Sequence, residues 1–178
     1  MAHVVVIAVG ADRPGIVASV TGVLVEHGCN LEDTSMTILR GHFTMMLVVE
    51  TPPDGDREAL TKGLTAAAAA VDVSLSVMPI EEGVTESPPG DPWTVSVYGA
   101  DRPGIVYGVA SLLARLGINI NDLTTRVAGT SGEPVYAMVL EVTIPPGVHP
   151  RELGMGLEAL AGELGVEHSL HPSDADIL

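Results

Sequence analysis

The hydrophobic positions in the first half of the chain switch between strand-length apolar runs and helical spacing. Residues 3–9 form a continuous apolar run, which predicts a central strand buried on both faces. Apolar residues then recur at helical spacing from Ile16 to Gly28, and glycine is typical of a helix end. The remaining expected elements are a polar edge strand, an apolar strand, an alanine-rich helix and a last strand, over residues 30–38, 43–50, 57–70 and 71–80. The order is βαββαβ.

The second half of the chain has the same pattern. Strands are predicted over residues 93–98, 118–127 and 135–144, with a short last strand beginning at Val166. Two helices are predicted from apolar residues at helical spacing, namely Ile105, Val106, Val109, Leu112, Leu113 and Leu116 in the first and Leu153, Leu157, Leu160 and Leu164 in the second.

An internal repeat explains why the two halves match. The octapeptide Gly-Ala-Asp-Arg-Pro-Gly-Ile-Val occurs identically at residues 10–17 and 99–106, an offset of 99 − 10 = 89. The second copy later carries four extra residues, which fall near 129–132 and have the composition of a hairpin loop. We therefore predict an α+β protein of two ferredoxin-like domains, each with an antiparallel sheet, both helices on one face, and its second and fourth strands at the edges.

The domain boundaries follow from the composition between the copies. Residues 81–92 are rich in Glu, Pro and Gly and have no periodicity, which is typical of an exposed linker. We expect the first domain over residues 1–80 and the second over residues 93–178. The polar second strands, which begin at Asn30 and Asn119, are unpaired edges and are expected to face each other or a partner.

Composition and charge limit the classes of partner. The chain of 178 residues is 46% hydrophobic, which excludes disorder. It has 8 basic against 23 acidic residues, a net charge of −15, which excludes a broad basic surface for nucleic acid and disfavours anionic membranes. No apolar run reaches the length of a membrane span, and the first strand leaves no room for a signal peptide, so we expect a cytoplasmic protein.

The repeated turn between first strand and first helix is the best candidate for a binding site. Free N–H groups at a helix start bind anions, and Gly15 and Gly104 let a ligand approach the backbone. The carboxylate of an amino acid would fit there, and Asn30, Asn119 or a strand-end carbonyl could accept hydrogen bonds from its ammonium group. The alternative is structural: Asp12 and Asp101 would only cap helices, and Pro14 and Pro103 would only shape the first turn.

The same residues carry a family resemblance. The octapeptide, followed by Glu-His-Gly-Cys-Asn-Leu-Glu-Asp at 26–33 or Arg-Leu-Gly-Ile-Asn-Ile-Asn-Asp at 115–122, resembles the signature of ACT domains. A tandem pair resembles the glycine cleavage system transcriptional repressor family. Similar turns occur in the ACT modules of formyltetrahydrofolate deformylase, phosphoserine phosphatase and uridylyltransferases, and no residues remain here for such catalytic domains.

The resemblance implies ligand sites at the seam between two ACT domains. There the first-helix turn of one domain faces the second strand of its neighbour. The implied ligand-binding residues are Asp12, Gly15, Ile16, Asn30 and Leu31 in the first copy and Asp101, Gly104, Ile105, Asn119 and Ile120 in the second. The copies differ at Cys29 and Leu31, where the second has Ile118 and Ile120, so the two sites need not have equal affinity.

The expected function is that of a non-enzymatic sensor. It would bind a small amino acid, glycine or serine, and relay this to a protein partner such as a transcription regulator, with a role in the expression of glycine cleavage genes and the capacity to form a homo-oligomer. We expect no catalytic residue, cofactor, metal, direct nucleic-acid contact or membrane. The alternatives are a ligand-free interaction module and a small enzyme on a ferredoxin-like fold. His168 and His171 are interpreted as exposed and Cys29 as a buried thiol.

Overall fold

A computed structural model of the chain describes residues 2–80, 89–128 and 135–173. The chain divides into two compact units, Met1–Glu86 and Ser87–Leu178, and each is described by itself. Most of the predicted linker, residues 81–88, and the predicted insertion at 129–132 lie outside the described residues.

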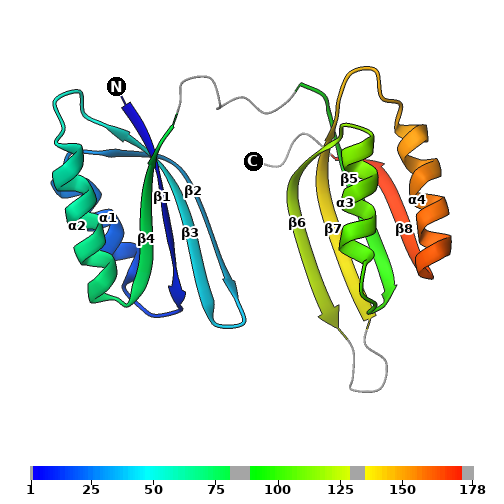
Figure 1. The fold of residues 1–178 in the computed structure, drawn as a ribbon, viewed down its shortest axis with the longest axis horizontal. Coiled ribbons are helices and arrows are strands. Elements are labelled where there is room, and N and C mark those ends of the chain that lie inside the picture. The colour runs from blue at the N-terminus through cyan, green and yellow to red at the C-terminus, as the bar shows by residue number, and fades with distance from the viewer. Residues whose placement is uncertain (1, 81–88, 129–134, 174–178) are drawn as a thin grey trace. The chain divides into compact units, whose positions relative to one another are not determined.

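The first unit has the predicted βαββαβ order (Figure 1). Its elements are β1 Ala2–Ala11, α1 Ile16–Glu26, β2 Asn30–Leu39, β3 His42–Thr51, α2 Arg57–Ala70 and β4 Val73–Pro79. The sheet is antiparallel with strand order β2-β3-β1-β4, so the prediction that the second and fourth strands are edges is confirmed. The last strand is shorter than expected because Val71 ends α2 and Asp72 turns the chain with a φ of 57°.

The second unit repeats this topology. Its elements are β5 Asp91–Ala100, α3 Ile105–Arg115, β6 Asn119–Ala128, β7 Val135–Ile144, α4 Pro150–Leu164 and β8 Val166–Pro172. The strand order is β6-β7-β5-β8. Strand β5 begins before residue 93, so Asp91 and Pro92 at the end of the predicted linker belong to the second unit.

Each core lies between one face of the sheet and the two helices that cover it (Figure 1). In β1 only Val4, Val6 and Ala8 are fully buried. The prediction that this strand is buried on both faces is therefore wrong within its unit: side chains alternate across a strand, and Val9 on the helix-free face is 44% exposed. An apolar run cannot distinguish a sheet covered on one face from a sheet covered on both.

Two irregularities shape the second strand. Arg40 and Gly41 both have positive φ, 50° and 81°, which is the backbone of a tight hairpin turn between β2 and β3. Near the start of β2 the ladder to β3 shifts register between Leu31 and Asp33, which leaves Glu32 as the extra residue of a β-bulge. The same shift occurs in β6 between Ile120 and Asp122.

Candidate functional site

The turn after β1 begins helix α1 without a side-chain cap. The N-cap residue is Gly15, with φ 96° and ψ −9°, and its carbonyl accepts the first helical bond from Ser19 N at 2.9 Å. Gly104 has the same role in α3, with φ 98°. The prediction that Asp12 and Asp101 cap these helices is therefore wrong, because each lies three residues before the N-cap.

The predicted positions of the prolines are corrected in the same way. Pro14 and Pro103 precede the N-cap glycines, so they lie outside the first helical turn. The main chain of Asp12 is instead tied to the β2–β3 hairpin, because its N–H donates to Gly41 O at 2.9 Å.

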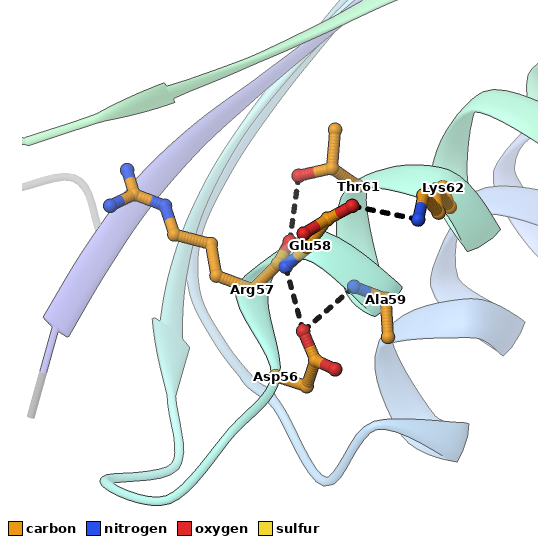
Figure 2. Close-up of polar contacts among 6 residues, drawn as sticks. All are labelled: Asp56, Arg57, Glu58, Ala59, Thr61 and Lys62. Atoms are coloured by element: carbon orange, nitrogen blue, oxygen red, sulfur yellow. Dashed lines mark hydrogen bonds and ion pairs between the residues drawn. The ribbon is translucent and has the colours of Figure 1, made fainter.

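The second helix of each unit has a side-chain cap, in contrast to the first helix of the same unit. The Asp56 carboxylate accepts hydrogen bonds from the N–H groups of Glu58 and Ala59 at 3.0 Å each, as Figure 2 shows. In the same turn Lys62 pairs with Glu58 at 2.7 Å. Helix α4 is capped by His149, whose Nδ1 accepts from Arg151 N at 3.2 Å.

The first backbone N–H groups of α1 and α3 therefore have no side-chain cap. The first N–H groups of any helix have no partner inside the helix. No side chain caps them at Gly15 or Gly104, and neither first turn holds an acidic residue. With the positive end of the helix dipole, these N–H groups can bind an anion. Ile16 and Ile105 as whole residues are only 1% and 2% exposed, so the side chains of these predicted site residues pack in the core and are not available to a ligand.

Part of the repeated octapeptide has a structural role. Arg13 forms an ion pair with Asp72 at 2.8 Å, which ties the turn to the connection between α2 and β4. In the second unit Arg102 Nη1 donates to Leu164 O at the end of α4, at 3.3 Å. A cation is favourable at a helix C-terminus, so the repeated arginine stabilises the turn and the end of the second helix.

The second group of predicted site residues lies at the start of β2 and β6. Asn30 is exposed opposite Glu50, and Leu31 is 41% exposed.

In the second unit Asn119 Nδ2 donates to Asn121 Oδ1 at 2.8 Å, and Asn121 Nδ2 donates to Thr143 Oγ1 at 2.8 Å. Because its NH₂ group is engaged, Asn119 presents its Oδ1 as an acceptor. Ile120 is half-buried against the core.

Within one unit the structure does not bring the two groups together. Asn30 pairs with Glu50, which pairs with His3 at one end of β1, whereas Asp12 follows Ala11 at the other end. Ala11 lies eight residue steps after His3 along β1, and at about 3.3 Å per step this is about 26 Å. A small ligand could bridge the two groups only if they came from two different domains. The seam between domains remains a prediction.

The pKa values of two side chains, Tyr136 and Cys29, are raised. Burial raises the pKa of Tyr136, the nearby Asp101 carboxylate adds to the rise, and Thr125 opposes it. Tyr136 pairs with Gly99 as Phe43 pairs with Gly10 in the first unit, and it was not among the predicted site residues. Cys29 was predicted to be a buried thiol, but it is only partly buried and lies just before β2. Burial raises the pKa of this thiol, which does not favour the reactive thiolate.

The histidine pair is only half as expected. His168 and His171 pair with Val97 and Thr94 across β5 and β8, so their side chains point to opposite faces of the sheet. The His168 side chain, however, is only 18% exposed, and its Nε2 lies 3.8 Å from Glu158 of α4. Its exposure was predicted wrongly because the helix that covers it is remote in sequence.

Comparison with known proteins gives the family. Two family models described as ACT domain match residues 2–78 and 93–150. The chain belongs to the ACT-domain family. It carries two ACT domains in tandem, as the resemblance implied.

Relatives of the tandem protein differ in how much they share with it. The glycine cleavage system transcriptional repressor of Escherichia coli is 26% identical over 95% of this chain and 89% of its own length. Phosphoserine phosphatase SerB2 of Mycobacterium tuberculosis is 30% identical over 85% of this chain, which spans only 37% of that protein. A solved structure of an unknown protein from Galdieria sulphuraria is 28% identical, with a TM-score of 0.83 over 97% of this chain and 99% of its own.

Among the residues that the structure describes, no helix is both long enough and apolar enough to cross a bilayer.

Proposed function

We propose that this tandem ACT protein is a non-enzymatic regulator that binds a small amino acid, glycine or serine, between ACT domains and passes the signal to a protein partner. The observation that carries the proposal is the contrast between helices. Helices α2 and α4 have side-chain caps, whereas α1 and α3, which begin within the repeated octapeptide, have none.

The chemistry of a free amino acid matches the two groups of residues. Its carboxylate would accept hydrogen bonds from the first turn of α1 or α3, where the helix dipole favours a negative charge. Its ammonium would donate to the side-chain oxygen of Asn30 or Asn119. Hydrogen bonds to charged groups contribute about 1.5–3 kcal/mol each, so both contacts would contribute measurably to the free energy of ligand binding.

The separation of the two groups suggests how binding becomes a signal. Since the groups lie about 26 Å apart in one domain, a bridging ligand joins the turn of one domain to the second strand of another. Such a ligand stabilises only the arrangement in which the domains meet. It therefore shifts the population toward that arrangement and changes the surface that a partner can recognise.

The similarity to the Escherichia coli repressor supports a role in regulating glycine cleavage genes. The net charge of −15 supports action through another protein, such as a transcription regulator, rather than through direct contact with DNA. We also propose a cytoplasmic location, because a protein that acts through a transcription regulator must meet it there.

Calorimetry of the full chain against the twenty amino acids tests this proposal. We expect saturable binding of glycine or serine without turnover. Asn30→Ala and Asn119→Ala should each weaken binding at one seam by about 1–3 kcal/mol, or roughly 5- to 150-fold. Thr65→Ala, on the exposed side of α2, is the control and should bind like the wild type.

Two results would contradict the proposal. Saturable binding of none of the twenty would favour the ligand-free interaction module. Chemical conversion of the bound amino acid would favour the enzyme.

A further inference from the structure

Three metal-ligating side chains converge on one sheet in the first unit. His3 on β1, Glu32 at the bulge of β2 and Glu50 on β3 each offer a ligand atom, and these atoms all lie within 4.8 Å of one another. His3 Nε2 lies 3.3 Å from Glu32 Oε2. Glu32 lies within the segment that resembles the ACT signature but was not a predicted site residue, and His3 and Glu50 lie outside that segment.

The strand register explains why these residues meet. His3 and Glu50 are direct partners across β1 and β3, on the helix-free face, since their neighbours Val4 and Val49 are buried under the helices. Glu32 is the extra residue of the bulge in the adjoining strand. A bulge re-aims the side chain that it inserts, and here it brings Glu32 to His3 across β3.

The second unit shows what this position looks like without charged residues. The register places Pro92 and Thr143 where the first unit has His3 and Glu50, and Asn121 occupies the bulge in place of Glu32. Asn121 and Thr143 hydrogen-bond to each other at 2.8 Å. Neutral groups satisfy one another in this way without a ligand, whereas two carboxylates repel each other.

In the part of the first unit that the structure describes, the carboxylates of Glu32 and Glu50 have no positively charged partner from lysine or arginine, so a bound cation would reduce their mutual repulsion. Among the described residues, no lysine or arginine forms an ion pair with Glu32 or Glu50. The side chains of His3 and Glu32 are 36% and 41% exposed, so an ion can reach them from solvent.

We propose that His3 Nε2 and the carboxylates of Glu32 and Glu50 bind one divalent transition-metal ion of the Zn²⁺ class. Ligand atoms about 2 Å from a tetrahedral ion lie roughly 3.3 Å apart, which matches the separation of His3 and Glu32. The imidazole favours a transition metal over Mg²⁺ or Ca²⁺, which prefer oxygen ligands alone. Three protein ligands leave a coordination position open for water or a small anionic ligand.

The test is metal titration of the tag-free, full-length protein without any amino acid present. Co²⁺ is followed by its visible absorption, and Zn²⁺ by calorimetry and by displacement of Co²⁺. We expect one site per chain. Glu32→Gln and Glu50→Gln keep the shape of the side chain but remove its charge. Each should weaken metal binding by at least about tenfold, because replacing even a residue that only orients a metal ligand lowers metal affinity by this factor.

Two controls separate this site from general surface binding. Glu58→Gln removes a carboxylate from the exposed start of α2, and His171→Asn removes an exposed histidine from β8. Both should bind the metal like the wild type. Circular dichroism checks that every variant is folded.

Three results would overturn the proposal. They are no saturable Zn²⁺ or Co²⁺ binding, equal loss of affinity in His171→Asn, and unchanged affinity in folded Glu32→Gln and Glu50→Gln. Because the titration contains no amino acid, its outcome is independent of whether the protein is an amino-acid sensor.

Discussion

At the scale of single residues, a comparison of Gly15 with Gly22 distinguishes the effect of backbone conformation from the effect of the space available to a side chain. A β-carbon added at either glycine would meet no atom within 4 Å. Gly15, however, has a φ of 96°, whereas Gly22 lies inside α1. Any difference between alanine variants at these positions must therefore come from the backbone.

We expect Gly15→Ala to lower the free energy of unfolding of the first unit by about 1–2 kcal/mol, because L-residues are strained at positive φ. Gly22→Ala should instead raise it by roughly 0.5–1 kcal/mol, since alanine loses less entropy in a helix. Urea unfolding measures both. A loss in Gly22→Ala, or no loss in Gly15→Ala, would contradict the assigned backbone conformations.

The same backbone makes the N-cap glycines poor probes of a ligand. Loss of binding in a Gly15 or Gly104 variant would combine strain with a blocked site. Asn30 and Asn119 lie exposed at strand starts, so their truncation reports on recognition with less disturbance of the fold.

At the scale of elements, the two helices of the first unit differ in how they begin. Asp56→Ala should cost about 1 kcal/mol, typical for the loss of an N-cap side chain. Asp12→Ala should cost less than about 0.5 kcal/mol, because Asp12 is exposed and its side chain caps nothing. Thermal and urea unfolding of the two variants give the comparison. Equal losses would mean that Asp12 acts as a cap after all.

The edge strands permit a second test at this scale. All of β2 is exposed in its unit, and it includes the apolar Leu31, Met36 and Ile38. An exposed edge of this kind favours pairing with another strand. We therefore expect the second strands, β2 and β6, to pair edge to edge, within one chain or between chains.

Hydrogen exchange of the full chain tests this pairing. The outward amides of β2 and β6 should exchange slowly because they are hydrogen-bonded, whereas those of the other edges, β4 and β8, should exchange fast. The fourth strands thus serve as the internal control. Equally fast exchange in all four edge strands would show that β2 and β6 are unpaired.

At the scale of the whole molecule, each unit has a hydrophobic core of its own. We expect limited proteolysis to cut first within residues 81–90, the part of the predicted linker that precedes β5, and to leave two folded halves, because linkers are cut more readily than packed domains. Mass spectrometry locates the first cut, and circular dichroism of the separated halves tests their folding. Early cleavage inside α1 or α3 would contradict this boundary.

The overall charge gives the last prediction. With 23 acidic and 8 basic residues, the pure protein should not bind duplex DNA, since phosphate contacts need clustered lysine and arginine. Fluorescence anisotropy with a labelled duplex at low and physiological salt measures this. Salt-sensitive, submicromolar binding would show that a local basic surface outweighs the net charge.

The sequence by itself determined the order of elements, the repeat, and which strands are edges. These properties depend on local periodicity and on an identity repeated along the chain, so no knowledge of contacts was needed. The octapeptide also marked the turn that begins α1 and α3. Its capping residue was assigned wrongly, because composition favours aspartate whereas the backbone turns at a glycine with positive φ.

Only the tertiary structure decided which faces are buried and which side chains meet. The face of β1 opposite the helices looks as apolar in sequence as the buried face, and only the placement of α1 and α2 distinguishes them. His3 and Glu50 are far apart in sequence, and they meet with Glu32 through strand register and a bulge. Register between remote strands depends on the packing of the whole sheet, which no local pattern contains.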